Sequence, residues 1–212
     1  MKKRLTPDAR RGQILEPAKQ VFAESGFRGT TTKSIANAAG VSEGTLFLYY
    51  PTKEELYQAI LQDNIDSQAP LMAELSSGGE RPLEETLTII ATMILRRYEE
   101  DTSLLRLLLY SALEDHALAT DIYRWQMDGP IHGLTVLLEE SGIDGVAGEL
   151  GAEIAVRTFL GMLLFEILTR ELFADLTPAR PIEEVAAGIV SIFLRGIERT
   201  EDNGAPAAGQ SI

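Results

Sequence analysis

The sequence has no cysteine, only two histidines and a single tryptophan among 212 residues. Without thiols, neither a disulfide framework nor a thiolate metal site can form, and His116 and His132 lack the spacing of a metal-binding pair. No glycine-rich phosphate loop, nucleophile elbow or metal quartet is found. We therefore expect no catalytic residues, no metal and no cofactor, and we expect that the protein is not an enzyme.

Long apolar runs are also absent, and none approaches the roughly 20 residues that a membrane-spanning helix requires. The N-terminus is polar and basic and lacks the apolar segment of a signal peptide. We therefore expect a cytoplasmic protein without a membrane partner. A length of 212 residues suits one small and one medium domain, and the apolar content of 45% is enough to fill a core.

Basic residues are few overall, and the net charge of −13 is unevenly distributed. Residues 1–56 hold nine basic and six acidic residues, a net charge of +3, so the remaining residues carry −16. Such asymmetry is expected of a small DNA-binding domain attached to an acidic body. The alternative, which accounts for most of the charge on the body, is that it serves solubility.

The stretch that organises the chain is residues 31–56, which predicts two short helices, a tight turn between them and the start of a longer helix. Thr31 and Ser42 are suitable N-caps because their hydroxyls can accept orphan backbone N–H groups. Gly40 suits the left-handed conformation of the turn. Thr52 and Glu55 form a capping box that starts the longer helix.

Small and apolar residues in this stretch have the spacing of a helix-turn-helix. Ala36 is small where the second helix crosses close over it, and Leu46 fills the space between the helices. Because positions three and four apart share a helix face, the outward face of the second helix consists of Gly44, Thr45, Leu48 and Tyr49. Such a helix can enter a major groove. The alternative is a helical hairpin within an ordinary α-domain.

Residues 14–56 closely resemble the DNA-binding region of the TetR (tetracycline-repressor-like) transcriptional regulators. The matching residues are Phe22, Gly26, Phe27, Thr30, Thr31, Ile35, Ala36, Ala39, Gly40, Val41, Ser42, Gly44, Thr45, Leu46, Tyr49, Tyr50, Lys53 and Leu56. The resemblance covers about the first quarter of the chain. It implies a bacterial regulator that binds double-stranded DNA as a homodimer, with two recognition helices meeting an inverted repeat.

The resemblance also implies which residues face DNA. The candidate DNA-binding residues are Thr31, Thr32, Lys33, Ser42, Glu43, Gly44, Thr45, Phe47, Leu48, Tyr49 and Lys53. Most of the hydroxyl and lysine side chains in this set are expected near phosphates, and Thr45 is also expected within reach of bases. Glu43 can accept from a cytosine amino group or face solvent, and we favour solvent.

Four residues depart from the family pattern. Pro17 lies inside the first helix, where we expect a kink. Ser34 replaces the acid that usually completes the capping box with Thr31. Phe47 replaces a tyrosine, and Leu48 stands where a polar or basic residue is common. Neither of these two can read hydrogen-bonding base edges, but either can pack on a thymine methyl group.

Helical patterns follow one another along the chain and predict an all-α fold of about nine helices. Beyond residue 56 the expected helices include 83–100, 103–115, 117–140 with an interruption near Gly129 and Pro130, 149–173 and 182–199. We divide the chain into a three-helix helix-turn-helix DNA-binding domain at 8–68, a regulatory, ligand-binding and dimerisation domain at 69–200, and flexible tails at 1–7 and 201–212.

The helices expected at 149–173 and 182–199 are apolar over more than one stripe, which is typical of a helix that is central or shared with a partner. The resemblance implies a four-helix bundle between two subunits. Candidate interface residues are Phe159, Gly161, Leu164, Leu168, Ile189 and Phe193. The alternative for Gly161 is a packing glycine within one subunit.

The middle helices carry aromatic and sulfur-containing residues suited to a mainly hydrophobic effector. The candidates are Tyr98, Tyr110, Tyr123, Trp125, Met127, Met162 and Phe165, and for each of them the alternative is an ordinary core position. Three hypotheses stay open: a ligand-released repressor, a regulator controlled by a protein partner without a small ligand, and a helical binding protein that has lost DNA affinity.

Overall fold

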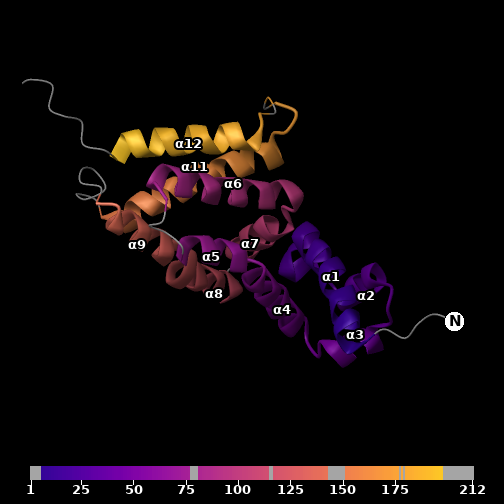
Figure 1. Ribbon diagram of the computed structural model, residues 1–212. Coiled ribbons are helices and arrows are strands. Elements are labelled where there is room, and N and C mark those ends of the chain that lie inside the picture. Colours follow the sequence, from indigo (N-terminus) through magenta and orange to yellow (C-terminus); the bar gives the residue numbers. More distant parts are fainter. Residues whose placement is uncertain are drawn as a thin grey trace, which may run out of the picture. The chain divides into compact units, whose positions relative to one another are not determined.

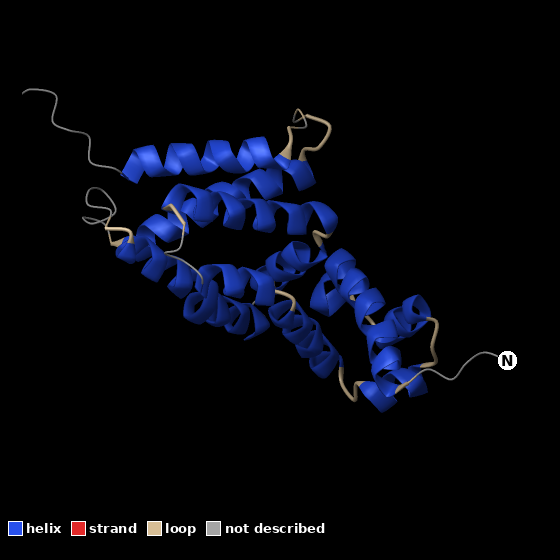
Figure 2. Cartoon of the chain, viewed as in Figure 1, coloured by secondary structure: helices blue, strands red, loops and turns tan. Residues whose placement is uncertain are grey.

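A computed structural model describes residues 6–76, 81–114, 117–142, 151–176, 178 and 180–197. All regular structure within these ranges is helical and no strand occurs in them (Figure 2), which confirms the predicted all-α fold. Within the same ranges, no helix has both the length and the apolar character needed to cross a membrane. The chain folds into two compact units, whose helices are labelled in Figure 1.

The first unit comprises Met1–Ala73 and Arg97–Gly129. It contains α1 (Pro7–Gly29), α2 (Thr32–Ala39), α3 (Glu43–Tyr49), α4 (Lys53–Asp66), α7 (Ser103–Leu113) and α8 (Ala117–Gln126). Helix α1 packs against α2, α4 and α7, so the N-terminal helices share a core with a helix from the middle of the chain. The largest fully buried side chains of this core include Ile14, Phe22, Ile35, Leu46, Leu56, Tyr57, Ile60 and Leu107.

Three aromatic side chains pack together in this core. The rings of Phe22 and Phe27 are stacked with centroids 6.0 Å apart, and Tyr57 meets them edge-on at 4.8 and 5.2 Å, both favourable arrangements for aromatic pairs. The Tyr57 hydroxyl donates a hydrogen bond to the Leu107 carbonyl at 3.2 Å. Burial raises the pKa of the Tyr57 phenol, so this hydroxyl keeps its proton and ties α4 to α7.

Helix α1 begins at a cap and breaks at a glycine. The Thr6 hydroxyl accepts from the Ala9 N–H at 3.3 Å, and the break lies at Gly26, with φ 69° and ψ 177°. Backbone angles stay helical at Pro17, where we expected a kink. Ile14 and Ala18, both fully buried, hold the helix to the core on either side of that proline.

The second unit comprises Glu74–Arg96 and Pro130–Ile212. Its main helices are α6 (Leu83–Glu100, up to Arg96), α9 (His132–Glu140), α11 (Ala152–Leu172) and α12 (Ile182–Ile197). Helix α11 packs against both α9 and α12, and the rings of Phe159 and Phe193 lie 5.0 Å apart between α11 and α12. Arg96 forms an ion pair with Glu183, which connects α6 to α12.

The chain between α8 and α9 forms a π-helix at Met127–Ile131, with Pro130 inside it. This confirms the interruption that the sequence predicted near Gly129 and Pro130. Proline has no N–H to donate to the preceding turn, so the regular α-helical bonding cannot continue through it. Single-turn π-helices within longer helices are frequent at functional sites.

The domain division at residue 68 stays a prediction, because packing groups the helices in a different way. Residues Arg97–Gly129 belong to the same compact unit as the helix-turn-helix. Helix α5 (Ala69–Ser76) begins in the first unit and ends in the second. The predicted tail at 201–212 and residues 1–5 of the other tail lie outside the described residues.

Candidate DNA-binding surface

Helix α2 begins at a reciprocal capping box. Thr31 Oγ1 accepts from the Ser34 N–H at 3.1 Å, and Ser34 Oγ accepts from the Thr31 N–H at 3.2 Å. The Ser34 hydroxyl therefore replaces the acidic side chain that usually completes such a box. Helix α2 ends at Gly40, in the left-handed conformation with φ 65° and ψ 36°, and Ser42 Oγ caps α3 by accepting from the Thr45 N–H at 3.1 Å.

Packing between α2 and α3 sets the orientation of the second helix. Ala36 and Leu46 are each only 2% exposed, and the Val41 N–H donates to the Ala36 carbonyl at 3.0 Å across the turn. A larger side chain at position 36 has no free space here, because protein interiors are close-packed. The predicted helix-turn-helix is therefore present, with α3 held rigidly against α2.

The outward surface of α3 carries two exposed apolar side chains. Leu48 is 77% exposed and Phe47 is 44% exposed, whereas Tyr49 is half-buried and packs against the core. A Cβ atom added at Gly44 meets nothing closer than Ser42 Oγ, at 3.9 Å. This side of α3 is therefore open, and another molecule can approach its backbone closely.

The polar side chains at the start of α3 are engaged within the protein. The hydroxyls of Ser42 and Thr45 lie 2.9 Å apart. Glu43 is exposed, and its Oε2 accepts a hydrogen bond from the Thr32 hydroxyl at 2.9 Å. No local pattern predicted this contact, which joins the first turn of α2 to the first turn of α3.

Lys53, the first residue of α4, binds the chain at the end of α1 and just after it, at residues 27–30. Its Nζ donates to the Phe27 carbonyl at 2.7 Å and to the Thr30 carbonyl at 3.0 Å, and it lies 4.2 Å from the centroid of the Phe27 ring. An ammonium group has three donors, so these two bonds leave one for the phosphate contact predicted for Lys53. The structural role of Lys53 was not predicted.

Glu114, which follows α7, binds the same segment from another helix. Its carboxylate accepts from the N–H of Phe27 at 3.1 Å and of Arg28 at 3.2 Å, and the Arg28 guanidinium donates to the Glu114 carbonyl at 2.9 Å. Nearby, the Tyr110 hydroxyl donates to the Glu24 carbonyl at 3.4 Å. Helix α7 therefore contacts the chain just before it enters the helix-turn-helix.

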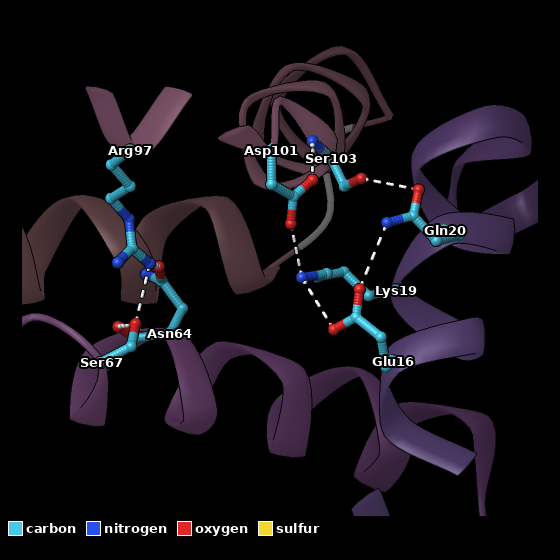
Figure 3. A network of polar contacts seen from close by, with 8 residues as sticks. All are labelled: Glu16, Lys19, Gln20, Asn64, Ser67, Arg97, Asp101 and Ser103. Atoms are coloured by element: carbon cyan, nitrogen blue, oxygen red, sulfur yellow. Dashed lines mark hydrogen bonds and ion pairs between the residues drawn. The ribbon is translucent and has the colours of Figure 1, made fainter. Parts of the chain in front are cut away.

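A polar network lies at the N-terminal end of α7 (Figure 3). Lys19 Nζ is 2.5 Å from Asp101 Oδ2 and 2.9 Å from Glu16 Oε2, and the Ser103 hydroxyl donates to Gln20 Oε1 at 2.8 Å. Burial by itself would raise the pKa of Asp101, but hydrogen bonds from Lys19 and Ser103 outweigh it and lower that pKa. These bonds connect α1 to α7.

A second part of the network connects α4 with the end of α6. Arg97 donates to Asn64 Oδ1 and, at 2.8 Å, to Ser67 Oγ (Figure 3). Asn64 is a buried polar residue, so the guanidinium satisfies an acceptor that would otherwise be costly to bury. Residues 97–114 therefore contact the N-terminal helices at several points along α1 and α4.

The predicted ligand-binding residues are divided between the two units. Tyr98, Tyr110, Tyr123, Trp125 and Met127 belong to the first unit, and Met162 and Phe165 belong to the second. Phe165 is 72% exposed on α11, so its assignment to a pocket is wrong for the single chain. Tyr123 is half exposed, whereas Trp125 and Met127 are partly buried beside the π-helix.

The predicted dimer-interface residues fall on two different faces of α11 and α12. Phe159 and Phe193 are 1% and 3% exposed and pack on each other, so they belong to the core of one subunit and their assignment to the interface is wrong. Leu164 is 42% exposed, and a Cβ at Gly161 meets nothing within 4 Å. Leu168 and Ile189 are half-buried.

A set of exposed apolar residues on α11 and α12 was only partly predicted. We call it the outer face of α11 and α12, and its members are Ile154, Leu164, Phe165, Leu172 and Ile192. Gly161 and Gly188 are also exposed, with open space where a Cβ would be. Large contiguous exposed apolar surfaces are typical of interaction sites.

A helix-turn-helix with an open second helix is the arrangement with which many DNA-binding proteins enter a major groove. The family described as "Bacterial regulatory proteins, tetR family" matches residues 14–60. The chain is 35% identical over 77 residues to the HTH-type transcriptional repressor KstR2 of Mycobacterium tuberculosis, a match that spans 36% of this chain and 38% of that repressor. It is also 26% identical over 196 residues to KstR2 of Rhodococcus jostii, covering 89% of this chain and 91% of the relative.

Among solved structures, the fatty acid degradation regulator FadR from Bacillus halodurans has the same fold. Its TM-score is 0.71 at 23% identity, over 93% of this chain and all of that one. Residues 14–60 therefore form a DNA-binding region of the TetR type. The relatives of the chain are transcriptional regulators and not enzymes.

Proposed function

We propose that the protein is a homodimeric repressor that binds an inverted-repeat operator through α3 and is released from it by a small, mainly hydrophobic effector. The observation that carries this proposal is the exposed side of α3, a helix that packs against α2. Phe47 and Leu48 are exposed there, and Gly44 leaves the backbone open to close approach. Similarity to two repressors named KstR2 supports repression as the outcome of binding.

Phosphate contacts are proposed for side chains around α2 and α3. Thr31 and Ser42 lie at the two helix starts, and Lys33 is an exposed cation on α2. Such contacts position the protein on the duplex and make binding salt-dependent, while contacts from α3 to base edges carry the sequence preference.

A homodimer is proposed through the outer face of α11 and α12. A two-fold dimer uses the same patch on both subunits, and exposed glycines among apolar side chains permit close helix contact. Two copies related in this way present two α3 helices, which matches the two-fold symmetry of an inverted repeat.

The effector is proposed to bind near the π-helix at Met127–Ile131. Trp125 and Met127 are partly buried there, and a Cβ at Gly129 comes within 4.0 Å of both Met72 and Trp125. An effector can release DNA only if it binds the free conformation more tightly than the DNA-bound one, and a coupling of about 1–3 kcal/mol is typical.

The proposal is tested with Gly44→Ala. Alanine favours a helix over glycine by up to about 1 kcal/mol, and a Cβ at position 44 has room in the free protein. We expect unchanged or higher thermal stability together with weaker binding to DNA flanking the protein's own gene, measured by fluorescence anisotropy. Unaltered DNA affinity in the variant would contradict the use of this face of α3.

The same assay separates the alternatives. A wild-type protein that binds neither that DNA nor any sequence from a random library would support a helical protein that has lost DNA affinity. If DNA binds but no hydrophobic small molecule releases it or changes Trp125 fluorescence, control by a protein partner becomes the better explanation.

A further inference from the structure

Helix α3 offers few groups that can read bases by hydrogen bonding. Its seven residues, Glu43–Tyr49, include no arginine, lysine, asparagine or glutamine, the side chains that most often read guanine and adenine. Of its polar groups, the Glu43 carboxylate accepts from Thr32 at 2.9 Å and the Thr45 hydroxyl is 2.9 Å from that of Ser42. Thr45 keeps spare hydrogen-bonding capacity and Tyr49 carries a hydroxyl, but α3 has no side chain that can make a bidentate hydrogen bond to guanine or adenine.

Besides Glu43, the exposed side chains of α3 are apolar. Leu48 is 77% exposed and Phe47 is 44% exposed, and removing such surface from water is favourable. Leu48 lies four residues after Gly44, so the two share a helix face. Because Gly44 has no side chain and open space around it, the helix can approach the groove closely enough for Leu48 to contact the base edges.

Among the base edges in the major groove, the prominent apolar group is the C5 methyl of thymine. Cytosine has only a hydrogen at C5, and its amino donor lies where thymine has the O4 acceptor. The exposed apolar side chains of α3 therefore favour thymine by the contact that they gain with its methyl group.

We propose that α3 reads thymine through its 5-methyl group, with Leu48 as the main specificity-determining side chain and Phe47 as the second. This inference rests on the proposed use of α3 as the DNA-reading helix. It names the chemical feature of the operator that the helix recognises.

The experiment uses the full chain and a chemical change of one methyl group. Preferred sites are first selected from a random DNA library with the wild-type protein. Each thymine of a selected site is then replaced singly by deoxyuridine, which removes the methyl group and leaves every hydrogen-bonding group in place. Dissociation constants are measured for the wild type, Leu48→Ala and Phe47→Ala. Leu113→Ala is the control, because this leucine is 83% exposed on α7.

We expect replacement of a contacted thymine to weaken wild-type binding about fourfold per methyl group, as for burial of one methylene-sized group. Leu48→Ala should bind the thymine and deoxyuridine sites equally at those positions. Where deoxyuridine still weakens binding by Leu48→Ala, it should no longer weaken binding by Phe47→Ala. The Leu113→Ala control should show the wild-type pattern.

The inference is overturned if no thymine in a selected site responds to deoxyuridine, or if the responses are the same in the wild type and in both α3 variants. These results leave the proposed function intact, because specific sites were selected. If the library yields no preferred sequence, the proposed function itself fails, and the inference that rests on it fails as well.

Discussion

Lys53 and Glu114 bind the two backbone polar groups of Phe27. Lys53 Nζ donates a hydrogen bond to the Phe27 carbonyl at 2.7 Å, and the Glu114 carboxylate accepts one from the Phe27 N–H at 3.1 Å. One side chain comes from α4 and the other follows α7, so helices distant in sequence hold the chain where it leaves α1. The segment 26–30 is therefore where a change in α7 can reach α2 and α3.

Replacing Lys53 by alanine should destabilise the first unit. The substitution removes two charge-assisted hydrogen bonds, to the carbonyls of Phe27 and Thr30, and hydrogen bonds to charged groups contribute about 1.5–3 kcal/mol each. Because Lys53 is partly exposed and water can replace it, we expect a loss of about 2 kcal/mol in the free energy of unfolding in urea.

The matched control is Lys33→Ala. Lys33 is exposed on α2, and its ammonium has no acceptor within the described part of the chain. Stability should stay unchanged in this variant, while the slope of log affinity against log salt falls by about 1 for the lost phosphate contact. Equal stability of the two variants would contradict the structural role of Lys53.

Replacing Glu114 by glutamine should loosen segment 26–30. A neutral amide oxygen accepts more weakly than a carboxylate, so the bonds from the Phe27 and Arg28 amides weaken. We expect faster native-state hydrogen exchange at those two amides and a loss of about 1 kcal/mol in stability. Glu24→Gln, an exposed side chain on α1, makes the same change of charge and should leave both exchange rates as they are.

Replacing Gly26 by alanine should be costly for two reasons. Its φ of +69° with an extended ψ is rarely adopted by residues with a side chain, and a Cβ there would lie 2.6 Å from Glu114 Oε1. We expect a loss of about 2–3 kcal/mol in the free energy of unfolding. Gly12→Ala, in the same helix with open space around it, should instead stabilise the protein by up to about 1 kcal/mol.

Features that depend on neighbouring residues could be predicted from the sequence. Thr31, Gly40 and Ser42 act as cap, turn and cap in the structure, because such residues act on backbone groups within one turn of the helix. The π-helix around Pro130 was anticipated as an interruption for the same reason. The DNA-binding assignments follow the same local pattern and remain predictions.

Contacts between distant residues could not be predicted. The bond from the Phe27 amide to Glu114 spans 87 positions, and no local pattern indicates which acid lies near which amide. The faces of α11 and α12 were confused for a different reason. Helix α11 is apolar over most of its circumference, so no polar stripe distinguishes buried Phe159 from exposed Phe165.

Acid should remove the contribution of Asp101. The pKa of Asp101 is lower in the folded protein than its ordinary value, which is about 3.9 in an unfolded chain. A depressed carboxyl pKa contributes stability that is complete well above pH 4 and is lost as pH falls through the folded pKa. The stability difference between wild type and Asp101→Asn should therefore shrink from pH 6 towards pH 3, measured by urea unfolding.

The control for that series is Asp66→Asn, which removes an exposed carboxylate on α4. Its stability difference from wild type should be small and nearly constant over the same pH range. A difference for Asp101→Asn that grows on acidification would contradict the assigned ion pair with Lys19, since the sign of the linkage would be reversed.

Adjacent residues on α12 distinguish the proposed interface from the core. Ile192 is 66% exposed on the outer face of α11 and α12, whereas Phe193 is 3% exposed against Phe159. Ile192→Asp should leave each subunit folded but separate the dimer, because it places two like charges in an apolar two-fold contact. Phe193→Asp should instead unfold the second unit, with a loss of about 4 kcal/mol or more. Sedimentation velocity combined with circular dichroism resolves both effects, and a wild-type protein that is monomeric at micromolar concentration would refute the proposed dimer.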